Sequence, residues 1–82
     1  MLYYLHVEVI IMELTMSEKI KILAKRSNIA LFQVAERSGQ TRQNLANKLS
    51  RNDFKISELK RIADALGVGL EVNFVLPSGE RV

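Results

Sequence analysis

Residues 36–50 read ERSGQTRQNLANKLS, and this stretch decides the fold of the chain. It places a single glycine, Gly39, between two runs with helical spacing, about 31–38 and 41–50. Glycine suits a left-handed turn position, where the β-carbon of another residue would be strained. Two short helices joined by a tight turn that contains glycine form the pattern of a helix-turn-helix.

Helix signals extend outward from this centre. Thr15 to Glu18 has the form of a capping box, which predicts a helix from there to about Arg26, with Asn28 as its stop. We expect Thr41 to cap helix 41–50, and Ser57 to cap a last helix that ends at Gly67. The apolar positions expected in the core are Ile20, Leu23, Ala24, Val34, Ala35, Leu45, Leu49, Phe54, Leu59, Ile62, Ala63 and Leu66.

Both ends of the chain change to a period of two. Tyr3 to Ile11 alternates and is rich in β-branched residues, which predicts a strand. Leu70 to Leu76 also alternates and predicts a half-buried strand, with a turn at Pro77-Ser78-Gly79. The prediction is a mainly α fold with short terminal strands, divided into a leader (1–14), a helical domain (15–68) and a C-terminal strand (69–82).

The charge is concentrated in the helical part. The 82 residues are enough for one domain, with a formal net charge of +3. Residues 15–66 carry eleven Lys or Arg against five Asp or Glu, whereas the residues before and after them are net negative. A basic segment fits a polyanionic partner, although a solvated helical surface is also consistent with it.

Several function classes lack the residues that they need. There is no cysteine, and the only histidine, His6, lies in the leader without a cluster of ligands around it, so we expect no metal and no cofactor. No nucleophile–base pair or glycine-rich phosphate loop is present, so we expect no enzyme. The apolar start is too short to span a bilayer and lacks the features of a signal peptide, and we expect a cytoplasmic protein.

The middle of the chain resembles the phage-repressor-like (XRE) helix-turn-helix family of transcriptional regulators. The resemblance runs from Glu18 to Val75 and rests on FQVAERSGQTRQNLANKLSRNDFKISELKRIADALGV, residues 32–68. The segments NLANKL, NDF, ELKRIADALG and EVNF are similar to small bacterial members with an added C-terminal strand. The resemblance implies a repressor-like domain of four to five helices that binds double-stranded DNA.

The resemblance also implies that helix 41–50 lies in the major groove. With its leucines inward, Asn47 points outward, Gln43 precedes it by one turn, Asn44 flanks them, and Arg42 reaches past the helix end. Asn and Gln can bond adenine at two positions, and Arg can bond guanine in the same way. We therefore expect base contacts from Arg42, Gln43, Asn44 and Asn47; the alternative is a polar, solvated face.

Phosphate contacts are expected at the edges of this face. The expected residues are Gln33, Thr41, Lys48, Arg51, Asn52 and Lys55. The chain departs from the family at Ala30-Leu31-Phe32, where members often have a hydroxyl cap and a polar phosphate contact. This departure either removes the contact at this end or moves it to Gln33. Leu49 and Arg51 stand where many members carry Glu and Gly.

The terminal strands predict how the protein assembles. One helix-turn-helix covers one half-site, and specific binding usually needs two. We expect a homodimer built through the terminal strands, the alternative being a monomer with a small internal sheet. The leading functional hypothesis is a sequence-specific transcriptional regulator, acting as a repressor. The competing hypothesis is an antitoxin-like interaction module that binds a partner protein through its strands.

Overall fold

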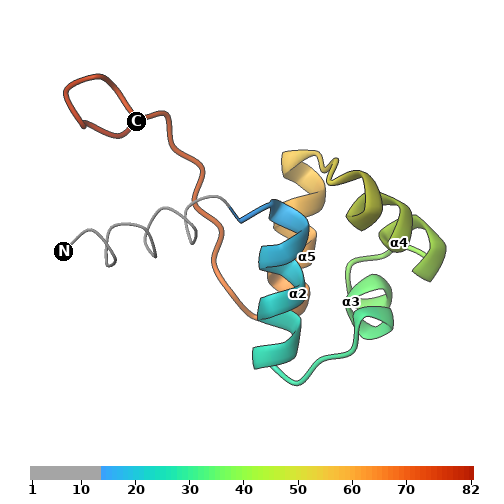
Figure 1. Ribbon diagram of the computed structural model, residues 1–82. Coiled ribbons are helices and arrows are strands. Elements are labelled where there is room, and N and C mark those ends of the chain that lie inside the picture. The colour runs from blue at the N-terminus through green and yellow to red at the C-terminus, as the bar shows by residue number, and fades with distance from the viewer. Residues whose placement is uncertain (1–13) are drawn as a thin grey trace, which may run out of the picture.

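The computed structural model describes residues 14–82, which form four helices followed by an extended tail (Figure 1). The helices are α2 (Met16–Arg26), α3 (Leu31–Arg37), α4 (Arg42–Arg51) and α5 (Ile56–Leu66). They confirm the predicted mainly α fold. The predicted N-terminal strand and His6 lie outside the described residues.

The beginnings of α2 and α4 follow the predicted capping chemistry. The Glu18 amide donates to Thr15 Oγ1 at 3.1 Å, and the Thr15 amide donates to Glu18 Oε1 at 3.2 Å, which completes the capping box. The Asn44 amide donates to Thr41 Oγ1 at 3.1 Å. Local sequence therefore determines where these two helices start.

The predicted cap of the last helix was wrong. Ser57 already lies inside α5, and the residue that precedes the helix is Lys55, which has extended backbone angles. Lys55 offers no side-chain acceptor, but its own amide donates to Glu58 Oε1 at 3.4 Å. The carboxylate three residues into the helix thus stabilises this end, and the Ser57 hydroxyl is not needed for it.

All four helices contribute to one apolar core. Ile20 and Ala24 come from α2, Val34 and Ala35 from α3, Leu45 and Leu49 from α4, and Ile62, Ala65 and Leu66 from α5. Phe54, in the loop before α5, packs against this core as predicted. Helix α3 contacts the other three helices, so it is the element around which the domain is built.

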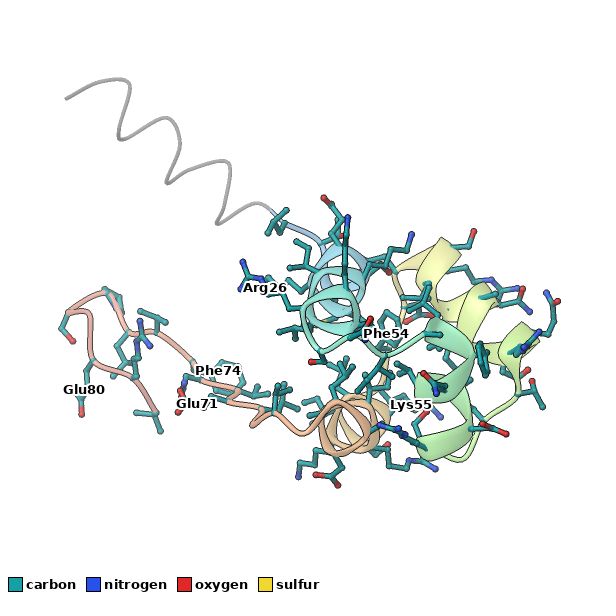
Figure 2. All side chains as sticks on the ribbon, turned by 90° about the horizontal axis from the view of Figure 1, so that it is seen from below. Arg26, Phe54, Lys55, Glu71, Phe74 and Glu80 are labelled. Carbon is teal, nitrogen blue, oxygen red and sulfur yellow. The ribbon has the colours of Figure 1, made fainter. Side chains whose placement is uncertain are left out.

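The predicted C-terminal strand was wrong. Beyond α5 the described chain runs away from the helices (Figures 1 and 2), and Phe74 is 82% exposed where a half-buried strand was expected. Only a single bridge forms, between Val75 and Arg81, within a turn in which the Phe74 and Val82 amides each donate to the other residue's carbonyl. The alternation is present in the sequence, but a strand also needs a neighbour, and a lone hairpin is marginal in water.

Candidate nucleic-acid interface

Helices α3 and α4 are joined by a tight turn centred on Gly39. Its φ of +75° is in the left-handed region that favours glycine, as predicted. The Gln40 amide donates to the Ala35 carbonyl at 2.9 Å, and the Gly39 amide donates to the Glu36 carbonyl at 3.1 Å. These are the two bonds of a Schellman motif, which ends α3 and directs the chain into α4.

The two faces of α4 differ in burial and in polarity. Leu45 and Leu49 are buried in the core, whereas Gln43, Asn44 and Asn47 are exposed. The predicted arrangement of this helix is therefore confirmed: one apolar side holds it on the domain, and amide side chains project from the other. Amides in such a position can donate to and accept from base edges at once.

Two of these amides are already linked to each other. Gln43 Nε2 donates to Asn47 Oδ1 at 3.0 Å, across one turn of the helix. The bond restricts both side chains while leaving Gln43 Oε1 as an acceptor and Asn47 Nδ2 as a donor. A neighbouring acceptor and donor match the N6 amino group and N7 of adenine.

Arg42 begins α4 and lies against α3. Its guanidinium carbon is 4.6 Å from the centre of the Phe32 ring, in cation–π geometry. Phe32 itself is 44% exposed. The arginine predicted as a base contact is therefore held by an aromatic neighbour from the other helix of the motif, a contact that the sequence analysis did not foresee.

The residues predicted as phosphate contacts differ in their hydrogen bonds and in their exposure. Gln33 Oε1 accepts the Ala30 amide at 2.9 Å, and Thr41 Oγ1 accepts the Asn44 amide, so each keeps its donor group for another partner. Arg51 and Lys55 are exposed and line the same hollow as Asn44 and Asn47.

Asn52 has a structural role that sequence reasoning missed. Its Oδ1 accepts the Ser17 amide at 3.0 Å. The single hydroxyl hydrogen of Ser17 is shared between the Leu49 carbonyl, at 2.7 Å, and Asn52 Oδ1, at 3.2 Å. Ser17 is buried at the start of α2. This joint fixes the end of α4 to the start of α2.

The sequence comparison agrees with this geometry. Residues 19–71 match the family model described as the Cro/C1-type HTH DNA-binding domain. The chain belongs to this family. Searches of curated proteins and of solved structures gave no match to the chain. The match covers all of α3, α4 and α5, so the surface described above belongs to the matched domain.

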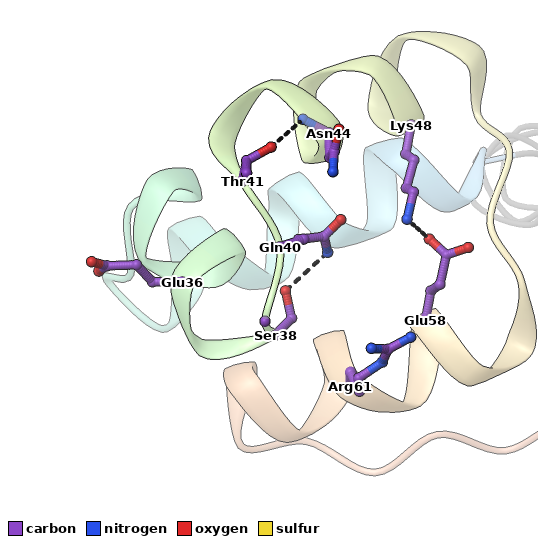
Figure 3. A pocket seen from close by; sticks show the side chains of 9 residues that line it. Glu36, Ser38, Gln40, Thr41, Asn44, Lys48, Glu58 and Arg61 are labelled. Atoms are coloured by element: carbon purple, nitrogen blue, oxygen red, sulfur yellow. Dashed lines mark hydrogen bonds and ion pairs between the residues drawn. The ribbon is translucent and has the colours of Figure 1, made fainter.

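A hollow between α4 and α5 of the Cro/C1-type domain is polar and contains an ion pair (Figure 3). Lys48 extends from α4 toward Glu58 on α5, and its ammonium group pairs with the Glu58 carboxylate. The Lys48 hydrogen bond lowers the pKa of Glu58, as do the amide and the charge of Lys55, while burial opposes the change. Lys48, predicted as a phosphate contact, is thus partly neutralised by an acid that the sequence analysis did not single out.

Arg61 on α5 also lines this hollow, together with Glu58 and Asn44 (Figure 3). It was missed because nothing in the local sequence of α5 shows that this face turns toward α4.

The described residues contain no group of three or more histidine, cysteine or acidic side chains that could hold a metal ion. None of the helices in residues 14–82 has the length and apolar character needed to cross a membrane.

Proposed function

We propose that this Cro/C1-type domain is a sequence-specific transcriptional regulator that reads the major groove of DNA with α4. The observation that carries the proposal is the linked amide pair of Gln43 and Asn47, which is exposed on α4 directly opposite the buried leucines. In this reading Arg42, Gln43, Asn44 and Asn47 contact bases. Each good two-point contact discriminates against a wrong base by about 1–3 kcal/mol.

The proposed phosphate contacts position α4 on the duplex. Gln33, in the first turn of α3, and Thr41, directly before α4, each keep a donor for a phosphate oxygen. Arg51 and Lys55 are exposed beside the proposed reading face, the side of α4 that carries Arg42, Gln43, Asn44 and Asn47. Lys48 contributes less to phosphate binding, because its ammonium group is paired with the Glu58 carboxylate. Asn52 contacts a phosphate through its Nδ2, the donor that stays available while its Oδ1 accepts from Ser17.

We further propose that the regulator is a homodimer assembled through its C-terminal tail, residues 69–82, and represses by covering promoter DNA. The main chain of residues 70–73 forms no backbone hydrogen bond within residues 14–82. Val72 is 56% exposed and Phe74 is 82% exposed, so the tail presents apolar side chains and an unpaired edge to solvent. Such an edge favours pairing with another strand, and a second copy supplies an identical one.

The same exposed tail supports one alternative. An antitoxin-like module binds a partner protein through such an edge, and DNA binding is then secondary. The two functions differ in what purified protein does alone: a homodimer pairs its tails without help, whereas a module of this kind stays monomeric until its partner is added.

Selection from a random duplex pool tests the proposal. Purified protein is incubated with the pool at about 150 mM salt, where phosphate-driven binding is already weak, and its mass in solution is measured in parallel. The proposal predicts a two-fold-symmetric consensus with half-sites about one helical turn apart. A folded protein that enriches no sequence and sediments as a monomer would contradict the proposal and favour the partner-binding alternative.

A further inference from the structure

An apolar hollow adjoins the proposed reading face of α4. It has a volume of about 420 Å³ and is lined by Leu31, Phe32, Arg42, Leu45, Ala46 and Leu49. Leu31 is 37% exposed and Phe32 is 44% exposed, so both apolar side chains are accessible to a bound ligand. The hollow lies between the first turn of α3 and the flank of α4 that carries Arg42.

The hollow opens on the same helix as the residues proposed to read bases. Arg42 and Ala46 are one turn apart on α4, and both line it, while Gln43 and Asn47 occupy the next positions along the helix. A duplex that meets Gln43 and Asn47 therefore brings its adjoining base edges to this flank. The apolar group that a major groove presents is the 5-methyl group of thymine, and phenylalanine and alanine side chains are suited to contact it.

Arg42 is held against the aromatic ring that lines this hollow. Its guanidinium carbon lies 4.6 Å from the centre of the Phe32 ring. Stacking in this way confines a long side chain while its N–H groups stay available at the edge, and an arginine edge bonds guanine at O6 and N7. Because the arginine and the ring touch, the two base features that they read must also be neighbours.

We propose that Phe32 and Arg42 act as one specificity-determining unit that reads a thymine next to a guanine in each half-site. Phe32, with Ala46, covers the thymine methyl group, and the same ring holds Arg42 toward the guanine. This inference rests on the proposed function of α4. It adds which two bases are read, thymine and guanine, and assigns Phe32 of α3 a part in their recognition.

The test uses base analogues in a duplex taken from the selection. Replacing thymine by deoxyuridine removes only the methyl group, and replacing guanine by 7-deazaguanine removes only N7. For the 82-residue chain we expect about four-fold weaker binding for each uracil at the relevant position, since burying one such carbon group contributes about 0.8 kcal/mol. We expect a loss of binding with 7-deazaguanine at the neighbouring base.

Variants assign these effects to the ring. Phe32→Ala is expected to lose most of the preference for thymine over uracil, with Ala46 as the only remaining apolar contact to the methyl group. Phe32→Leu keeps an apolar contact and is expected to retain the preference for thymine while responding less to 7-deazaguanine, because the stacked arginine is released. Ile22→Ala removes another exposed apolar side chain, from α2, and is expected to change neither ratio. The exposure of Phe32 favours folding of its variants, which the helical circular dichroism signal checks.

Two results would overturn the inference while leaving the proposed function intact. One is a protein that binds its selected duplex specifically but tolerates uracil at every thymine. The other is a Phe32→Ala variant that keeps the full preference for thymine over uracil. A pool selection that yields no consensus would refute the proposed function itself, and this inference with it.

Discussion

The joint between Asn52 and Ser17 yields a stability prediction that separates a side-chain contact from backbone strain. Asn52 ends α4 in the left-handed region with φ of +52°, and Asn28, after α2, has nearly the same conformation with φ of +55°. Only Asn52 bonds across the domain, where its Oδ1 accepts the Ser17 amide at 3.0 Å. Asn28 is therefore a matched control for the cost of placing alanine at such a position.

The magnitudes follow from these two contributions. An alanine in the left-handed region costs about 1 kcal/mol, so Asn28→Ala should lower the free energy of unfolding by about that amount. Asn52→Ala adds the cost of leaving the Ser17 amide without its partner, about 1 kcal/mol or slightly more. For a domain of this size the extra 1 kcal/mol corresponds to a melting temperature about 4–8 °C lower than that of Asn28→Ala.

Thermal and urea unfolding of the two alanine variants, followed by circular dichroism, measures this difference. Asn52→Asp retains an oxygen acceptor and should lie between wild type and Asn52→Ala. Equal destabilisation by Asn28→Ala and Asn52→Ala would refute the reasoning, because the side-chain bond would then contribute nothing and α4 would be held by its leucines alone.

Three further predictions concern charge and assembly. Glu58→Gln should lower stability at neutral pH, measured by urea unfolding, and have no such effect once the pH falls below the depressed pKa of Glu58. A carboxyl with a lowered pKa stabilises the fold above its ordinary value of 4.5 and loses this contribution as it is protonated, so an effect of the same size at every pH would contradict the ion pair with Lys48. Arg51→Ala and Lys55→Ala should each reduce the slope of log K against log salt by about 0.9, equally on every DNA sequence, and an unchanged slope would remove that residue from the phosphate contacts. Phe74→Ser should weaken the dimer in sedimentation experiments and leave the helical signal intact, because the ring is 82% exposed; sedimentation identical to wild type would contradict a dimer formed through the tail.

Features that depend on a few neighbouring residues could be predicted from the sequence. The capping box at Thr15, the cap at Thr41 and the left-handed turn at Gly39 each follow from chemistry within four residues, and the structure places all three as expected. The buried leucines of α4 and its exposed amides follow from helical periodicity in the same way.

Features that depend on how the helices cross could not be predicted. The Ser17–Asn52 joint links residues 35 positions apart, and the Lys48–Glu58 pair and the position of Arg61 depend on the packing of α4 beside α5. The tail shows the opposite error: the alternation over residues 70–76 is a property of the sequence, but the strand that it predicts depends on a pairing partner that residues 14–82 of one chain do not supply.

The most direct test of the account is the ratio of specific to non-specific DNA affinity in a protein whose α4 amides are removed. Binding of wild type and of the double variant Gln43→Ala, Asn47→Ala is measured on a selected duplex and on a scrambled one at the same salt concentration. The account predicts that affinity for the selected duplex falls by about 1–3 kcal/mol or more while affinity for the scrambled duplex is unchanged. Equal loss on both duplexes, or no loss on either, would contradict base reading by α4.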